Sequence, residues 1–513
     1  MTNSLDRLRR DAKALKKAYE AGDKPALARV AAHPPRSDGG DLKHADFLHV
    51  IAQENSFASW PVLKQMVAAQ GLDRAGRQQR LKRALAQGQN AVVDRLLAET
   101  SDLADGLFAL EVALLNRDAV ARMLEEDPGW ATRDAGPRRP ILHLAFSRRI
   151  HAVPDRAADM IAIAEMLVEN GASVNDSCAA GPGNDHPLSA LYGAIGHADN
   201  MVLGQWLLDR GADPNDGEPL YHATELGHHD GLEMLLKAGA DPKGTNALLR
   251  AMDFHDHAAV QMLLDHGARA DDFNDAVVGG EAPWVMPALH QAARRMSDAR
   301  MIDLLLEAGA DPGRTHQGAS AYGYARVFGN ADLARAIEAA GDVPGLTPEE
   351  RLLAMAADGE VPAGAYLDPA KLPEAYRNIV RLILHLPGKM AHIRRLVAMG
   401  AEYDRPDAEG LTPVQLAGWE GLPDMLAYFL ALKPDLGHVN GYGGTLLSTI
   451  IHGSENCPDR AGRDHVGCLR LALEEGVALP EKAADAAGDP GVASFLSDWA
   501  RAYPGQVVQG GPV

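Results

Sequence analysis

The 513-residue chain is poor in cysteine and in aromatic residues. Its three cysteines, Cys178, Cys457 and Cys468, form no C-x-x-C pair and no zinc-type cluster with histidine, which fits a reducing, cytoplasmic setting. Aromatic residues make up only 5% of the chain, although 46% of it is hydrophobic. We therefore expect a core of Ala, Leu and Val, which suits small, repeated helices.

The sequence also lacks long apolar segments and an excess of positive charge. Residues 1–23 contain no apolar core of a secretory signal, and no stretch is apolar enough to span a bilayer. The formal net charge is −20, from 50 Lys and Arg against 70 Asp and Glu. Because nucleic-acid phosphates bind cationic surfaces, we expect neither nucleic acid nor a membrane as a partner.

Familiar catalytic motifs are missing as well. There is no G-x-S-x-G element, no HExxH or H-x-x-x-H spacing, and no cysteine within a nucleophile pattern. The glycine-rich residues 441–444 lack the flanking strand and the Lys-Ser/Thr of a phosphate loop. The acidic loops at 271–275 and 459–464 lack the ligand spacing of a calcium loop. The sequence therefore predicts no enzymatic activity, no cofactor and no bound metal.

A recurring phrase is what the sequence does contain. "EMLLKAGADP" at residues 233–242 returns as "QWLLDRGADP" at 205–214 and as "IDLLLEAGADP" at 302–312. An anchor residue, usually Ala, recurs four residues before a Gly-His-like pair in eleven units, and one long gap has room for two weaker units, around 351–360 and 378–402. The anchors are Ala84, Ala113, Ala145, Tyr192, Ala223, Ala251, Ala292, Ala325, Ala417, Ile450 and Ala484.

These features resemble the ankyrin repeat, which has a period of about 33 residues and a first helix that begins T-P-L-H-x-A. The best copy is "DAEGLTPVQLAGWEGLPDMLAYFL" at 407–430, and partial copies begin at 140–145, 218–223 and 287–292. The resemblance covers about residues 80–500. It implies an all-α solenoid of helix–loop–helix repeats with short hairpin loops, in which each repeat buries its apolar face against its neighbours.

The repeat phrase also has a local physical logic. Thr412 is placed to cap a first helix, with Pro413 at the first helical position, where a missing N–H costs nothing. A glycine follows each of several second helices and is expected in the left-handed conformation, after which Asp-Pro prevents further helix. These glycines are Gly171, Gly211, Gly239 and Gly309.

Four segments follow from this pattern. Residues 1–75 are a helical leader, 76–344 and 345–478 are two blocks of repeats, the second partly degenerate, and 479–513 are a C-terminal capping repeat with its tail. The phrase "NSFASWPVLK" in the leader resembles a helical segment that precedes bacterial ankyrin arrays. We expect this leader to cap the first repeat. A role of its basic helix in docking an acidic partner is the alternative.

Histidine is abundant, with 20 residues, and is expected to be structural. His143 and His290 hold the T-P-L-H position, where the side chain bonds nearby backbone. His229 and His257 hold equivalent places in adjacent repeats, but neighbouring repeats are about 10 Å apart, too far for the two rings to share one metal ion.

Three insertions, at 147–160, 270–286 and 452–467, interrupt the period and are expected on loops of one face. They leave open an atypical enzyme or ligand-binding protein with a site formed over the groove. Its candidate residues are His151, Asp155, Asp185 and His186.

The leading hypothesis is a non-catalytic scaffold that binds a protein or peptide. In ankyrin repeats, the two residues before the Gly-His pair face the concave groove, and aromatic and Arg side chains are common interface anchors. A packing role for the aromatic members is equally open, as is an adaptor whose ends, 1–110 and 370–513, bind separate partners. The candidate partner-binding residues are Arg148, Leu226, Phe254, Arg294, Arg295, Phe328 and Trp419.

Overall fold

The structure is a computed structural model, and most of it is helix. Helices account for 59% of the residues and strands for 5%. The chain divides into two compact units, one of residues 72–345 and one of residues 1–71 with 346–513. Among the described residues, no helix combines the length and the apolar character needed to traverse a membrane. The described residues are 5–34, 42, 44–55, 60, 63, 73–136, 138–181, 183–216, 218–276, 285–341 and 343–509.

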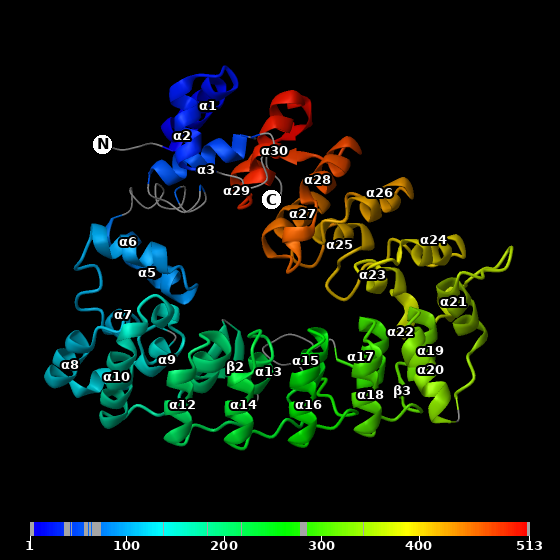
Figure 1. Cartoon of the computed structure of the whole chain (residues 1–513), viewed down its shortest axis with the longest axis horizontal. Helices are drawn as coiled ribbons and strands as arrows, with labels where there is room; N and C mark the ends of the chain where they lie inside the picture. The colour runs from blue at the N-terminus through cyan, green and yellow to red at the C-terminus, as the bar shows by residue number, and fades with distance from the viewer. Residues whose placement is uncertain are drawn as a thin grey trace. The chain divides into compact units, whose positions relative to one another are not determined.

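In the unit 72–345, short first helices alternate with second helices, so that each kind forms its own row (Figure 1). The first helices are α5 (Arg74–Ala86), α7 (Phe108–Ala113), α9 (Pro140–Ala145), α11 (Ala190–Tyr192), α13 (Glu218–Ala223), α15 (Ala247–Asp253), α17 (Ala288–Arg295) and α19 (Ala321–Phe328). The second helices are α6 (Asn90–Glu99), α8 (Arg117–Glu126), α10 (Ala157–Glu169), α12 (Met201–Asp209), α14 (Asp230–Lys237), α16 (His257–Asp265), α18 (Ala299–Glu307) and α20 (Ala331–Ala340). We call the first of these sets the first-helix row.

Small anchors let the first helices approach one another. The anchors Ala84, Ala223, Ala251, Ala292 and Ala325 are all buried, as the close spacing of helices requires. The exception is the anchor of the fourth unit, a tyrosine that is only half-buried. There α11 continues as a π-helical turn, Gly193–His197, whose wider turn changes the direction in which side chains point.

The residues that end several second helices adopt the conformation that the sequence predicts. Gly171, Gly211, Gly239 and Gly309 all have left-handed backbones, with φ between 83° and 100°. The carboxylates of Asp213 and its equivalents then accept a hydrogen bond from the backbone N–H two residues later, which closes an Asx turn. The turn stops the helix and directs the chain into the next repeat.

Asparagine side chains connect successive loops. Asn175 accepts a hydrogen bond from the backbone N–H of Asp213 (2.8 Å) and donates one to the carbonyl of Gly211 (3.1 Å). Asn215 makes the equivalent pair with Asp241 (2.7 Å) and Gly239 (3.5 Å). The loops of three consecutive repeats are therefore joined along the edge of the stack.

Strands are few and short. β1 (Ser177–Gly181) and β2 (Asn184–Ser189) form an antiparallel hairpin, and β3 (Thr315–His316) pairs with β4 (Ala319–Ser320) in the same way. The anchors Ala223 and Ala251 are only 28 residues apart, which predicts a shortened hairpin, and no strand lies between α14 and α15. The insertion at 147–160 forms two 3-10 turns, Arg148–His151 and Pro154–Arg156, before α10.

The unit of residues 1–71 and 346–513 contains the leader and the later repeats, and within it α3 packs against α30. The long gap in the anchor pattern holds α21 (Pro348–Asp358) near the first of the two expected weaker units, and α22 (Glu374–Arg377), α23 (Ile379–Ile383) and α24 (Met390–Ala398) near the second. The insertion at 452–467 spans the end of α27, a 3-10 turn and the start of α28. That at 270–286 lies partly outside the described residues.

The helices of this unit are α1 (Leu5–Glu20), α2 (Lys24–Ala32), α3 (His44–Glu54), α21 (Pro348–Asp358), α22 (Glu374–Arg377), α23 (Ile379–Ile383), α24 (Met390–Ala398), α25 (Pro413–Trp419), α26 (Pro423–Ala431), α27 (Leu446–Asn456), α28 (His465–Glu474), α29 (Ala483–Ala486) and α30 (Pro490–Ala502). Its strands β5 (Leu479–Pro480) and β6 (Val507–Val508) pair in parallel. Thr412 caps α25 with Pro413 at its first turn, as predicted, and Gln415 completes a capping box.

Candidate functional site

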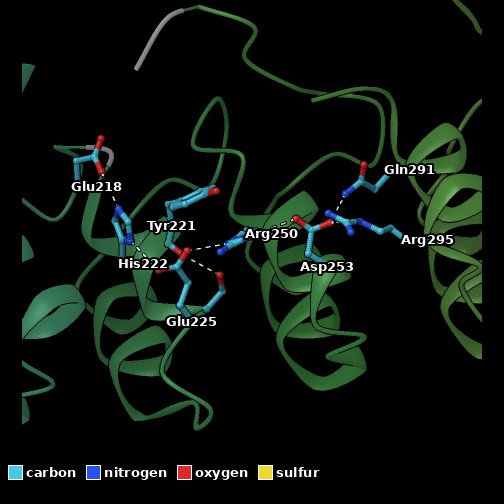
Figure 2. Close-up of polar contacts among 9 residues, drawn as sticks. Glu218, Tyr221, His222, Glu225, Arg250, Asp253, Gln291 and Arg295 are labelled. Atoms are coloured by element: carbon cyan, nitrogen blue, oxygen red, sulfur yellow. Dashed lines mark hydrogen bonds and ion pairs between the residues drawn. The ribbon is translucent and has the colours of Figure 1, made fainter. Parts of the chain in front are cut away.

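A network of charged side chains begins on α13, in the first-helix row (Figure 2). His222 lies between two carboxylates, with Nε2 3.1 Å from Glu218 and Nδ1 2.9 Å from Glu225. The second oxygen of Glu218 is 2.5 Å from Nε2 of His186, on the β2 strand of the preceding hairpin. Because a neutral imidazole carries one N–H, His222 can donate to both carboxylates only when it is protonated.

The network continues across α15 to α17. Arg250 Nε donates to Glu225 (2.7 Å), and its Nη1 is 3.4 Å from Asp253. Asp253 also accepts from the Gln291 amide (2.5 Å) and pairs with Arg295 Nε at 2.7 Å. Figure 2 shows these contacts running from one helix to the next. Polar bridges, rather than apolar contact alone, therefore join the exposed sides of three neighbouring first helices.

The pKa values follow from this arrangement. Burial opposes the charge on His222, but the hydrogen bonds that His222 donates to Glu218 and Glu225 prevail and raise its pKa to about 9. Burial likewise opposes the charges of the two carboxylates, and their bonds to His222 nevertheless lower both pKa values. At neutral pH, three carboxylates, of Glu218, Glu225 and Asp253, thus face three cations, of His222, Arg250 and Arg295, and the charge is locally neutral.

Aromatic rings run along the same row. The Phe146 ring lies 5.7 Å from that of Tyr192, which lies 4.9 Å from His222, and His222 lies 5.1 Å from Tyr221. The Arg250 guanidinium then bridges to Phe254, with its central carbon 4.8 Å from the ring centroid. We call Phe146, Tyr192, His222, Tyr221 and Phe254 the ring series.

Members of the ring series differ in exposure. Phe146 is buried, Tyr192 and Tyr221 are half-buried, and Phe254 is 51% exposed. Burial raises the pKa values of both tyrosines, which keeps their hydroxyls protonated as hydrogen-bond donors. The series therefore combines one exposed ring with two half-buried tyrosines.

The predicted partner-binding residues fall into three groups. Arg148 and Phe254 are exposed and Leu226 and Arg295 are half-buried, all along the first-helix row. Arg294 is buried and donates to Gln291, and Phe328 is fully buried and stacks on Tyr324, so neither side chain offers surface to a partner. Trp419 is half-buried in the other compact unit. The structure therefore brings together only part of the predicted row.

Sequence reasoning missed Tyr192, Tyr221, His222 and Arg250, which form the centre of this surface. The signal was present in "EPLYHA", where Tyr221 takes the place of the histidine in T-P-L-H and a second ring follows it. The π-helical turn that presents Tyr192 leaves no such signal in the sequence.

Histidines elsewhere in the repeats support structure. His143 Nε2 contacts the carbonyl of Ala135 (3.0 Å), and that of His290 contacts Ala319 (3.1 Å). His229 and His257 each pair with the aspartate that caps the next second helix, at 2.7 and 2.8 Å. Within the described ranges, no three His, Cys, Asp or Glu side chains gather so that they could hold a metal ion.

The residues proposed for an atypical enzyme do not converge. His151 contacts the carbonyl of Ala198 (2.6 Å), whereas Asp155 and Asp185 are exposed. Only His186 reaches the network, through Glu218. These four side chains therefore do not form a catalytic group.

Comparison with known proteins identifies the repeat family of one segment of the first-helix row. A family model described as "Ankyrin repeats (3 copies)" matches residues 191–275. Residues 191–275 are ankyrin repeats. This ankyrin segment contains α13 and α15 with most of the charged network.

Solved ankyrin structures also match the chain. The human ASB11 ankyrin repeat domain is 21% identical, with a TM-score of 0.35, and the match covers 47% of this chain and 100% of that domain. An ankyrin repeat domain from Acinetobacter baumannii is 21% identical, with a TM-score of 0.30, and covers 39% of this chain and 97% of its own. No curated protein matches the chain.

Proposed function

We propose that the protein is a non-catalytic scaffold that binds a protein or peptide along the first-helix row, in the groove that ankyrin repeats commonly use. Ankyrin repeats generally mediate protein–protein interaction. The observation that carries the proposal is the exposed ring of Phe254 and the half-buried ring of Tyr221, which lie 4.8 and 5.7 Å from the same Arg250 guanidinium. Large apolar side chains that remain exposed together on a rigid surface are typical of binding sites.

The charged network supports this function by fixing the surface in advance. Arg250 is held by Glu225 and Asp253 while its guanidinium faces Phe254, so a partner meets a ring whose neighbour is already ordered. Binding then costs little side-chain entropy, and this cost is one of the main losses in association. The three cysteines are free and buried, in accordance with the cytoplasmic location that forms part of the proposal.

Selection of peptides tests the proposal directly. A library of random 16-residue peptides is displayed and selected on the full chain, and the dissociation constants of synthetic copies are measured by fluorescence anisotropy. We expect Phe254→Ala and Tyr221→Ala each to weaken binding about ten-fold or more, as loss of an interface anchor does.

The matched control is Tyr366→Ala, which removes a 69% exposed ring from the other compact unit. It should leave the dissociation constants unchanged. Peptides that respond to Tyr366→Ala but not to Phe254→Ala or Tyr221→Ala would contradict the proposal, because the binding surface would then lie elsewhere.

A further inference from the structure

The end of the ring series at Phe146, beside α9, differs in charge from its centre. Arg138 places its guanidinium carbon 4.0 Å from the centroid of the Phe146 ring. Arg148 directs two nitrogens at the carbonyl oxygen of His197, at 2.8 and 2.6 Å. The rings of Phe146 and His197 are themselves 5.2 Å apart, so both guanidiniums contact this pair of residues, Arg138 at the Phe146 ring and Arg148 at the His197 backbone. We call Arg138 and Arg148 the arginine end.

The two positive charges of the arginine end are not neutralised. Within the described part of the chain, neither Arg138 nor Arg148 makes an ion pair with a carboxylate, whereas the neighbouring Arg139 and Arg149 pair with Asp176 and Asp94. Arg148 is exposed and Arg138 half-buried. A chain with a net charge of −20 thus keeps two guanidiniums without a carboxylate partner at the Phe146 end of the ring series.

The electrostatic effect of both arginines reaches His197, whose ring lies against Phe146 of the ring series. Burial first, and then the charges of Arg148 and Arg138, lower the pKa of His197 to about 4. His197 is therefore neutral at physiological pH and adds no charge of its own. Moving from the arginine end to Phe254, the surface changes from positive to neutral, and a complementary ligand should change from anionic to apolar.

We propose, on the basis of the function proposed above, that the partner is a peptide segment with an anionic group at the arginine end and an apolar or aromatic residue on Tyr221 and Phe254. The anionic group is an Asp or Glu side chain. Neighbouring first helices are about 10 Å apart, and an extended chain advances about 3.3 Å per residue. The acidic and the apolar residue are therefore separated by about six to nine residues of extended peptide.

The charge of the network argues against the reverse polarity. A basic residue over Tyr221 would meet Glu218 and Glu225, but both carboxylates are already bonded to His222, and Glu225 to Arg250 as well. A basic residue at the arginine end would be repelled. The acidic residue gains a charge-assisted interaction at Arg148 and Arg138 without displacing an existing ion pair.

The test compares the peptides selected on the wild-type full chain with those selected on Arg138→Gln, Arg148→Gln and the double variant. We expect wild-type selection to enrich Asp or Glu six to nine positions from an aromatic or large aliphatic residue. The single variants should weaken binding of synthetic peptides about three-fold each and the double variant about ten-fold, with loss of the acidic preference.

Three controls make the outcome decisive. Arg335→Gln removes an exposed arginine from α20, outside the row, and should change nothing. Thermal melting checks that the variants fold; Arg138→Gln is the safer one, because Arg148 also holds the backbone at His197. Raising NaCl from 50 to 500 mM should reduce wild-type affinity more than that of the double variant, because salt screens exposed charges.

The two proposals fail in different ways. The anionic anchor alone would be overturned if Phe254→Ala still weakened binding but the selected peptides showed no enrichment of Asp or Glu. The same would follow if the double variant changed their dissociation constants by less than two-fold. Peptides insensitive to Phe254→Ala and Tyr221→Ala would overturn the proposed function and the anchor together.

Discussion

Two pairs of neighbouring first helices, one in each compact unit, are joined in opposite ways. Between α13 and α15, charged side chains span the gap, with Arg250 reaching Glu225. Between α25 and α27, the backbones approach each other through glycine. A Cβ on Gly453 would overlap the carbonyl oxygen of Trp419, and one on Gly418 would lie 2.6 Å from Ile450.

The difference shows that one repeat pattern can give two kinds of contact between neighbouring first helices. In the open joint, between α13 and α15, side chains bridge the gap and can form a binding surface. In the close joint, between α25 and α27, the backbones touch. Side chains that bridge a wider gap remain half-exposed, and their rings and polar groups are available to a partner. Where helices touch through glycine, the Gly453 backbone lies against that of Trp419, whose carbonyl also accepts a hydrogen bond from His465 (2.9 Å). The close joint contributes rigidity through packing, and the open one is where we propose that a partner binds.

The largest effect is expected from Gly453→Ala, which would break the close joint. Alanine favours a helix over glycine by about 1 kcal/mol, but here its methyl group would overlap the backbone of Trp419. Because a backbone cannot rotate away as a side chain can, we expect a net destabilisation of about 3 kcal/mol or more in urea unfolding.

Gly462→Ala is the matched control, since nothing lies within 4 Å of its added Cβ. It should change the free energy of unfolding by less than about 0.5 kcal/mol. A Gly453→Ala protein as stable as the wild type would show that α25 and α27 are not in backbone contact.

The second prediction breaks the open joint instead. Asp253→Asn keeps the shape of the side chain but removes the negative charge that faces Arg250 and Arg295. Because those cations are partly buried, losing their counter-charge should cost about 1–2 kcal/mol in urea unfolding. Asp332→Asn, at an exposed ion pair with Arg335 on α20, should cost less than about 0.5 kcal/mol. Equal effects at the two sites would mean that the network adds nothing to an ordinary surface pair.

Protonation of His222 gives a third, pH-dependent test of the open joint. Its pKa is raised to about 9 in the folded protein, so the stabilisation is complete below the ordinary value of 6.5 and is lost as the pH rises through about 9. His222→Gln should therefore be less stable than the wild type by about 1–2 kcal/mol at pH 6, after allowance for partial solvent exposure, and nearly equal to it at pH 10.

Chemical unfolding at pH 6, 8 and 10 measures this gap. Tyr192 and Tyr221 have raised pKa values and so should stay neutral through the transition. His266→Gln is the control, because that ring contacts the backbone carbonyl of Met262 rather than a carboxylate. A gap between wild type and His222→Gln that does not change with pH would show that the imidazole is neutral between the two glutamates.

What the sequence can predict depends on how far apart in the chain the interacting residues lie. The left-handed Gly239 and the cap at Thr412 depend on residues close in sequence, so local chemistry is enough to predict them. The bridge from Arg250 to Glu225 joins side chains 25 positions apart, and that from Asp253 to Gln291 joins side chains 38 apart. Such contacts depend on which way each helix turns within the stack.

Aromatic residues show the same limit more sharply. Phe254 and Phe328 hold equivalent positions in the repeat pattern, yet Phe254 is 51% exposed and Phe328 is fully buried against Tyr324. The sequence places both at a helix end but does not say whether a neighbouring ring will cover them. The π-helical turn after Tyr192 is equally invisible, because no single residue type specifies it.

The smallest effect is expected at the loops. They connect the same repeats as the open joint, but through hydrogen bonds between an asparagine side chain and the backbone of the next loop. Asn175 and Asn215 each bond to the next loop, whereas the equivalent position of the following repeat is Lys243. The spacing from Lys243 to Gly267 equals that from Asn215 to Gly239, and both glycines are left-handed. Asn246 and Asn274 already join these two loops, so Lys243→Asn should add a second bridge and stabilise the protein by about 0.5–1 kcal/mol in urea unfolding. Lys243→Ala, which removes the same cation without adding an amide, should show no such gain; if it stabilises equally, the effect comes from charge and the loop bridge contributes nothing.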